Sequence, residues 1–417
     1  MRIILILLFI CHMYSSQAQK GNNTSNSPLL QSLLNRDTLL QELIKNKDAY
    51  RLQIIYTAID RDKNNSPSFT PHYFNVNSNT YFYPASTAKM PVAFLALQKL
   101  NEIKIKGLSK YTTMLVDSAS PMQTKVIGDA SSKDGHASIA NYIKKIFLVS
   151  DNDANNRVYE FLGQAYINNN LHKMGYTNAQ VLHRLGVSLS EAENRHTKTI
   201  RFNLQDGKTV YNQPAQYSNL PYQKRNDYVG KGYYKNDSLI NAPFNFSLKN
   251  KLVLPDLTKQ LLSVLFPYSF KKAERFNLSQ SDYKFLYQYL SQLPTEQQYP
   301  IIDSTEKYDA YCKFLLYGAN ANTVIPKHIR IFNKIGVAYG FVTDVAYIVD
   351  FEKNIEFALS ATIYVNEDGI LNDDKYEYEK IAYPFMKNLG EVIYKYELQR
   401  NRTYKPNLSK FVVDYTK

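Results

Sequence analysis

Cysteine is scarce in this chain, which limits how the fold can be stabilised. The sequence has 417 residues and 2 cysteines, Cys11 and Cys312. A single positive charge near the N-terminus precedes an apolar run of about eight residues and then small and polar residues, a pattern typical of a secretory signal that is cut after Ala18. Removal of residues 1–18 leaves one thiol, which excludes a disulfide within the mature chain. Stability must then come from a hydrophobic core, and about 400 residues can supply one.

Apolar runs long enough to span a bilayer are also missing. The N-terminal run is too short for a transmembrane helix, so we expect an exported, periplasmic protein with no stable membrane span. Lipidation of Cys11 is the alternative, but Ile10 is a poor neighbour for that modification. We therefore favour a cleaved secretory signal.

Motifs for binding metals or nucleic acids are absent as well. The 7 histidines show no metal-ligand spacing, and we expect neither a metal nor a cofactor. The formal net charge of +13 is spread along the chain, which is typical of a solvated basic surface. The alternative is attraction to anionic envelope polymers or to carboxylate substrates. We expect a monomer with no nucleic-acid partner.

The order of the predicted elements indicates a mixed α/β protein whose sheet is built from both ends of the chain. Strand patterns at 51–59 and 71–76 precede a long apolar helix, and three more form a meander after residue 326. Helical patterns dominate between them. We divide the chain into a signal peptide at 1–18, a disordered start and N-terminal helix at 19–50, an α/β sheet region at 51–110 and 326–400, a helical region at 111–325 and a C-terminal tail at 401–417.

Residues 198–250 form a polar, tyrosine-rich insertion within the helical region, without sustained periodicity. Loops of this length in a compact fold are either functional covers or disordered. We favour an ordered loop near the functional site, because its aromatic side chains could stack on a ligand. Helical patterns resume at 254–315.

Ser86 and Lys89 form the first motif that points to chemistry. They lie three residues apart where a strand-rich stretch gives way to the apolar helix. Positions i and i+3 share one face of a helix, so the Lys89 amine can reach the Ser86 hydroxyl and take its proton as it attacks a carbonyl. Only this pair opens a long apolar helix after a predicted strand, although the same spacing recurs at Ser269/Lys272, Ser281/Lys284 and Ser304/Lys307.

Two further elements follow this pair in order. Ser-Asp-Asn at 150–152 ends an apolar helical run, and Lys-Ile-Gly at 334–336 begins a pattern of strand, turn and strand. With these motifs the chain resembles the penicillin-recognising serine hydrolases, most closely the class A β-lactamases, whose signature is S-x-x-K, S-D-N and K-T-G. The resemblance covers roughly residues 45–200 and 325–400. It implies a serine β-lactamase/transpeptidase-like α/β (α+β) fold, in which helices flank an antiparallel sheet and an all-helical region is inserted.

The resemblance places the active site in the cleft between the sheet region and the helical region. Ser86 would be the nucleophile there. At the start of a helix its backbone N–H can stabilise a developing oxyanion. The second donor would be the backbone N–H of Val337, directly after Gly336, and a backbone donor works with almost any side chain.

Three polar residues would complete the site. Ser150 would relay a proton to the leaving nitrogen, and Asn152 would hold the substrate amide and the Lys89 amine. Lys334 would supply positive charge for Ser150 and for a substrate carboxylate. The alternative for residues 150–152 is a helix-capping turn, since all three residues favour caps, and capping is compatible with catalysis.

Two positions depart from the family pattern. Family members usually carry Thr or Ser where this chain has Ile335, which cannot donate a hydrogen bond to a substrate carboxylate. Class A enzymes activate the hydrolytic water with the Glu of R-x-E-x-x-x-N, but here Arg184 aligns and Gly186 stands at the Glu position. Glu191 is our candidate base, brought into the site by a longer loop; an exposed charged loop is the alternative.

Three functions remain open. The first is an exported serine hydrolase that resembles class A β-lactamases and hydrolyses the cyclic amide of a β-lactam through a Ser86 acyl-enzyme. The second is a cell-wall D-Ala peptidase or amidase of the same superfamily, acting on a peptidoglycan peptide, because a missing base slows hydrolysis more than acylation. The third is a non-catalytic envelope binding protein, which Ile335 and Gly186 favour and the intact set of polar motif residues opposes.

Overall fold

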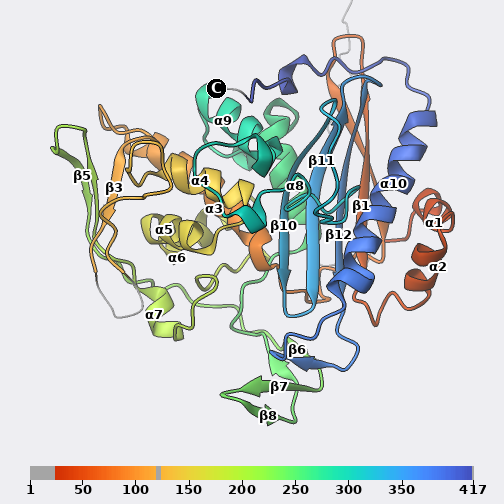
Figure 1. Ribbon diagram of the computed structural model, residues 1–417, viewed down its shortest axis with the longest axis horizontal. Helices are drawn as coiled ribbons and strands as arrows, with labels where there is room; N and C mark the ends of the chain where they lie inside the picture. Colours follow the sequence, from red (N-terminus) through yellow and green to blue (C-terminus); the bar gives the residue numbers. More distant parts are fainter. Residues whose placement is uncertain (1–23, 119–123, 416–417) are drawn as a thin grey trace, which may run out of the picture.

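A five-stranded antiparallel sheet forms the centre of the molecule (Figure 1). The computed structural model describes residues 24–118 and 124–415, so the predicted signal peptide, including Cys11, lies outside the described part. The strand order is β10-β11-β12-β1-β2, which makes β10 an edge strand. The strands are β1 (Gln53–Arg61), β2 (Pro67–Phe74), β10 (Ile329–Ala338), β11 (Phe341–Asp350) and β12 (Ile355–Tyr364).

The sheet is assembled from both ends of the chain. β1 pairs with β12 in antiparallel register, with Gln53 opposite Thr362. Every residue of β11 and β12 is buried, because helices cover both faces of the sheet. One face carries α1 (Pro28–Leu34), α2 (Thr38–Lys45) and α10 (Tyr383–Gln399), and the other carries α8 (Leu254–Leu265) and α9 (Gln280–Ser291).

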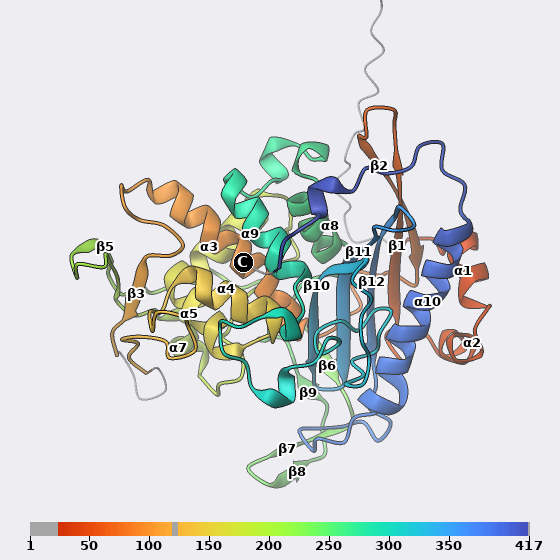
Figure 2. The ribbon, with the colours of Figure 1, turned by 45° about the horizontal axis from the view of Figure 1, so that its top comes forward.

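A helical region lies beside the edge strand β10 (Figure 2). Its central helix is α3, which is buried continuously from Lys89 to Leu100 and packs against α4, α5 and α6. A helix that is apolar all round needs such a covered position. The turn before α3 packs against β10, so the site lies where the two regions meet. The helices are α3 (Lys89–Ile103), α4 (Ile139–Leu148), α5 (Asn152–Leu162), α6 (Gln164–Lys173) and α7 (Glu191–Arg195).

Short strands form three smaller sheets. Residues 198–250 contribute most of them, so the predicted polar insertion is ordered. Its aromatic residues Phe244 and Phe246 pack on Tyr339, in the turn between β10 and β11. The sheets are β3 (Thr113–Val116) with β4 (Ile200–Asn203) and β5 (Thr209–Gln213), β6 (Tyr228–Val229) with β9 (Phe244–Asn245), and β7 (Gly232–Lys235) with β8 (Ser238–Ile240) and β13 (Ile370–Leu371).

The predicted fold class is confirmed, since helices flank an antiparallel sheet and a largely helical region is inserted between its strands. The inserted region also carries the β3-β4-β5 sheet. No helix in residues 24–118 and 124–415 is long and apolar enough to cross a membrane.

Two details of the helix prediction are wrong. The single helix expected before residue 50 is split in two, because the Asp37 carboxylate accepts a hydrogen bond from the Leu40 N–H (3.0 Å) and starts a second helix. The helical pattern expected up to residue 315 ends with α9 at Ser291. Beyond it, Pro294 and the capping residue Asp303 start short 3₁₀ turns instead.

Candidate active site

Ser86 lies on a 3₁₀ turn, Ala85–Ala88, that leads directly into α3. The turn is closed by Thr87, whose Oγ1 donates to the Pro84 carbonyl at 2.6 Å. Residues on both sides of Ser86 are buried, whereas Ser86 itself is half-buried and lines a cavity of about 980 Å³. The nucleophile predicted from the sequence is therefore held rigidly with a surface open to a ligand.

The Lys89 side chain is fully buried next to Ser150 and Asn152. Its Nζ donates to Asn152 Oδ1 at 2.6 Å, to Ser150 Oγ at 3.4 Å and to the Ser150 carbonyl. Burial lowers the pKa of Lys89 well below its usual value, and the nearby charge of Lys334 lowers it further. A neutral amine can accept a proton, so this environment suits Lys89 for the role of general base.

Residues 150–152 both cap a helix and face the two lysines. The Asp151 side chain accepts a hydrogen bond from the Ala154 N–H at 2.7 Å and caps α5. Ser150 adopts a left-handed backbone with a φ of 58°, which separates it from the end of α4. The motif therefore fits both interpretations: Asp151 caps the helix, and Ser150 and Asn152 contact the lysines of the site.

Lys334 approaches Ser150 from the other side. Its Nζ donates to Ser150 Oγ at 2.7 Å and to the Ile335 carbonyl at 3.0 Å. Burial lowers the pKa of Lys334 to about 8, so it stays largely protonated at neutral pH. Ser150 thus lies between Lys89 and Lys334, an arrangement that lets a hydroxyl pass a proton onward.

The edge strand β10 presses against the nucleophile turn at Gly336. A Cβ added there would lie 2.5 Å from the Pro84 carbonyl and 3.0 Å from the Ser86 nitrogen. Only glycine allows this approach. Val337 follows and lines the same cavity, in the place where its N–H is predicted to be the second oxyanion donor.

Ile335 gives the cavity an apolar wall where the family pattern has a hydroxyl. The side chain is 6% exposed and belongs to the core beneath α10, and it also lines the cavity. At this position the cavity therefore offers no hydroxyl to a substrate carboxylate.

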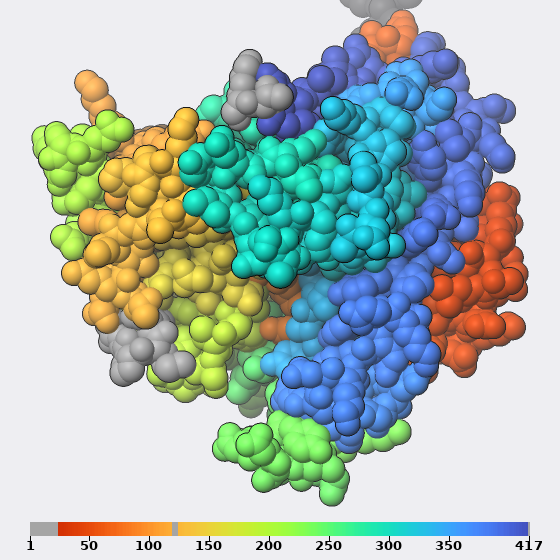
Figure 3. All heavy atoms as spheres, in the orientation of Figure 1, coloured from red at the N-terminus to blue at the C-terminus, as the bar shows by residue number. Residues whose placement is uncertain are grey.

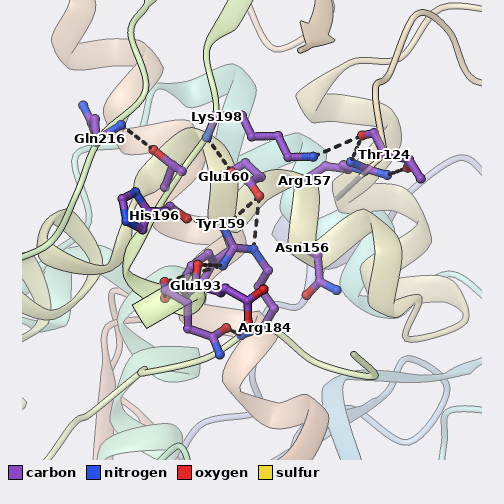
Figure 4. A network of polar contacts seen from close by, with 12 residues as sticks. Thr124, Asn156, Arg157, Tyr159, Glu160, Arg184, Glu193, His196, Lys198 and Gln216 are labelled. Carbon is purple, nitrogen blue, oxygen red and sulfur yellow. Dashed lines mark hydrogen bonds and ion pairs between the residues drawn. The ribbon is translucent and has the colours of Figure 1, made fainter. Parts of the chain in front are cut away.

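The chain after α6 is anchored beside the site by a buried polar network (Figure 4). Arg184 forms an ion pair with Glu160 at 2.7 Å, and both side chains are 2% exposed. Glu160 also accepts from the Lys198 N–H at 2.9 Å. Asn156 exchanges two hydrogen bonds with the backbone of Leu185, at 2.8 and 2.9 Å. This part of the predicted family pattern is in place.

Gly186 stands against Asn152 and brings no side chain to the site. It has a φ of +68°, and a Cβ there would lie 2.6 Å from Asn152 Nδ2. The position at which the family pattern carries Glu therefore faces Asn152. It provides no carboxylate to activate water.

Glu191 does not replace the missing carboxylate, so its prediction as the base is wrong. Its side chain is 46% exposed and forms an ion pair with Arg195 at 3.0 Å. Glu193 is used to cap α7 with Ser190. The residue that turns inward is Asn194, whose Oδ1 accepts from the Arg184 N–H at 2.9 Å. These local bonds hold both carboxylates at the surface, and neither lines the cavity.

Much of the cavity wall comes from residues that the motifs did not indicate. Residues 306–320 lie between the helical region and α10, over a hollow visible in Figure 3. They are held in place by the buried Asp344, which accepts from the N–H groups of Phe314 (3.2 Å) and Leu315 (3.0 Å). The added lining residues include Glu306, Tyr308, Tyr311, Cys312, Tyr317, Glu379 and Tyr383.

No residue of 198–250 lines the cavity, so that insertion does not supply the expected stacking surface.

No group of His, Cys, Asp and Glu side chains in the described part of the chain is arranged to hold a metal ion.

Comparisons with known proteins identify relatives of this chain. The family model Beta-lactamase2, described as the beta-lactamase enzyme family, matches residues 36–218. This range includes Ser86, Lys89 and residues 150–152. The chain is thus similar to the β-lactamase family over this range, and the resemblance predicted from the motifs is confirmed. No curated protein matches.

Similar solved structures include two β-lactamases and a protein named PBP-A. The β-lactamase from Xanthomonas campestris pv. campestris has 14% identity over 88% of this chain and 96% of its own, with a TM-score of 0.46. The class A β-lactamase from Clostridium kluyveri has 13% identity over 86% and 99%, with a TM-score of 0.46. PBP-A has 13% identity over 90% and 100%, with a TM-score of 0.46.

Proposed function

We propose that this chain is a serine hydrolase that forms an acyl-enzyme at Ser86 with a cyclic or terminal amide, and that releases a β-lactam acyl group slowly. The observation that carries the proposal is the arrangement of Lys89, Ser150 and Lys334 beside the nucleophile turn, connected at 3.4 and 2.7 Å through Ser150 Oγ. These three side chains can serve both proton transfers of acylation, from Ser86 and to the leaving nitrogen.

Acylation needs one proton to leave Ser86 and one to reach the leaving nitrogen. Neutral Lys89 accepts the hydroxyl proton as Ser86 Oγ bonds to the carbonyl carbon. The backbone N–H groups of Ser86 and Val337 stabilise the oxyanion. When the C–N bond breaks, Ser150 gives its proton to the nitrogen and receives the proton that Lys89 took from Ser86. Lys89 is then neutral again, and Lys334 keeps its positive charge throughout.

The natural substrate that we favour is a D-Ala peptide of peptidoglycan. With glycine at position 186 and Glu191 at the surface, the site lacks the carboxylate that class A enzymes use to activate water. A released D-Ala leaves the cavity and frees space for water, whereas the opened β-lactam keeps its nitrogen attached to the acyl group. Slow hydrolysis therefore affects a β-lactam adduct more than a peptide adduct.

β-Lactam hydrolysis is the second candidate. It is supported by the description of the matching family model as a beta-lactamase enzyme family. Under either candidate we propose an exported, periplasmic monomer, on the strength of the N-terminal sequence pattern. N-terminal sequencing of the mature protein should then begin at Gln19.

Intact-protein mass after mixing with benzylpenicillin tests the proposal, with Ser86→Ala as the control. We expect a penicilloyl adduct that persists for many minutes in the wild type and is absent from Ser86→Ala, together with release of D-Ala from a muropeptide. An adduct that disappears within seconds while penicilloate accumulates would support the β-lactamase instead. If no adduct forms and no D-Ala is released, the chain is a binding protein and the proposal is wrong.

A further inference from the structure

We propose that a second cavity, remote from Ser86, binds a small primary amine with an apolar body. The cavity has a volume of about 620 Å³ and shares no lining residue with the catalytic cavity. It lies between β1, β2, the start of α8 and the chain after α6. Its size suits one small ligand. The apolar part of the lining includes Ile55, Phe69, Tyr73, Val253, Leu262 and Phe270.

Asp256 gives this cavity an unpaired carboxyl group. It is the third residue of α8 and lines the cavity. Its Oδ2 is enclosed and has no hydrogen-bond partner among the described residues. Burial raises the pKa of Asp256 to about 7. An aspartate in the first turn of a helix gains from the helix dipole, but that gain does not require the carboxylate to be enclosed.

The neighbouring charges do not neutralise Asp256. Lys259 is close enough to lower its pKa, but the Lys259 Nζ donates to Glu274 Oε1 at 2.8 Å. Lys259 and Glu274 therefore form a balanced pair. Lys173 also lines the cavity, but its side chain is exposed and it is not among the groups that shift the pKa of Asp256, so the enclosed Asp256 oxygen is left without a cation in contact. A buried carboxyl without a partner is costly, so a bound group that donates hydrogen bonds to it would be stabilised.

The chemistry of the cavity selects an organic cation. Of the two carboxylates that line the cavity, Glu274 is paired with Lys259, and Asp256 alone provides too few ligands for a metal ion, since cations such as Ca²⁺ take six or more oxygens. A primary ammonium group needs one strong acceptor and can direct its remaining donors to the cavity mouth. The aromatic and aliphatic walls suit a hydrocarbon or aryl body attached to that ammonium. This inference is independent of the function proposed for Ser86.

Calorimetric titration with phenylbutylamine and its neutral analogue phenylbutanol tests the proposal. The titrations are run at about pH 8.5, where Asp256 is ionised and the amine is still protonated. In the wild-type protein the amine should bind about tenfold or more tightly than the alcohol, because its contact with the carboxylate is charge-assisted. Asp256→Asn should reduce the affinity for the amine to that for the alcohol. Asp303→Asn, which changes an exposed carboxylate, is the matched control and should change neither.

Thermal unfolding of the same variants provides an independent readout. Asp256→Asn should raise the Tm at this pH, because it removes a charge that is enclosed without a partner, whereas Asp303→Asn should not. The wild-type comparison of amine with alcohol decides the matter even if Asp256→Asn does not fold. Equal affinities for the two compounds in the wild type would overturn the proposal, as would no binding of the amine. Full retention of amine binding in a folded Asp256→Asn protein would also overturn it.

Discussion

The substitution Gly186→Ala tests whether the loop after α6 affects the orientation of the Lys89 amine. A Cβ on Gly186 would lie 2.6 Å from Asn152 Nδ2, which is too close for non-bonded atoms, and the atoms nearest to it all belong to the Asn152 side chain. That amide must therefore move. Its Oδ1 accepts a hydrogen bond from Lys89 Nζ at 2.6 Å, so Gly186→Ala should weaken the bond that orients the general base.

Two separate costs are expected for this substitution. A left-handed backbone costs an alanine about 1–2 kcal/mol of folding free energy. Loss of a hydrogen bond to the neutral Lys89 amine costs about 0.5–1.5 kcal/mol. Only the second cost acts on the reaction, and at about 1.4 kcal/mol per factor of ten it corresponds to acylation that is about 2- to 10-fold slower.

Gly207→Ala separates the two costs. Gly207 also has a positive φ, +84°, but a Cβ there meets nothing within 4 Å. Gly186→Ala should lose at least as much thermal stability as Gly207→Ala, because the clash with Asn152 adds to the backbone cost that both share. Only Gly186→Ala should form the benzylpenicillin adduct slowly when intact mass is followed over time. Equal acylation rates in the two variants would refute the link between Gly186, Asn152 and Lys89.

Three further predictions concern the same site. The acylation rate should rise as pH increases through the lowered pKa of Lys89, because the amine must be neutral to accept a proton. It should fall above about pH 8, where Lys334 loses its proton. A flat pH profile would contradict both roles. Arg184→Ala leaves the buried Glu160 without its ion-pair partner and should lower the free energy of unfolding, measured by chemical denaturation, by about 3–5 kcal/mol. A decrease below about 1 kcal/mol would show that the ion pair does not hold the loop. Glu191→Gln should leave the lifetime of the penicilloyl adduct unchanged, and a longer lifetime would return Glu191 to the role of base.

Sequence reasoning succeeded where the chemistry is local. Ser86 and Lys89 belong to one helical turn, so their spacing alone predicts their proximity. The strand patterns of β1, β10, β11 and β12 are strongly apolar and fix the sheet made from both chain ends. Residues 150–152 and Lys334 could be proposed only because their order matches a known family, since nothing in their local sequence indicates that they meet.

The rest of the site depends on contacts between distant residues. Whether Glu191 turns toward Ser86 is decided by Arg195 and by Asn194, which binds the backbone of Arg184. The cavity wall at 306–320 does not follow the helical pattern expected up to residue 315, and it is held by Asp344, a residue of β11. Neither arrangement leaves a signal in a short stretch of sequence.

Asn152 contacts both Lys89 and the position at which the family pattern carries Glu. Its Oδ1 completes the surroundings of Lys89, and its Nδ2 fills the space beside Gly186. A carboxylate at position 186 would require a left-handed backbone at a residue with a Cβ, and it would displace the amide that orients the lysine. In this structure the Asn152 side chain that contacts Lys89 therefore fills the space that a side chain at position 186 would need. For the proposed acyl-enzyme we therefore expect slow release of a β-lactam, and we expect that Gly186→Glu alone does not make the release fast.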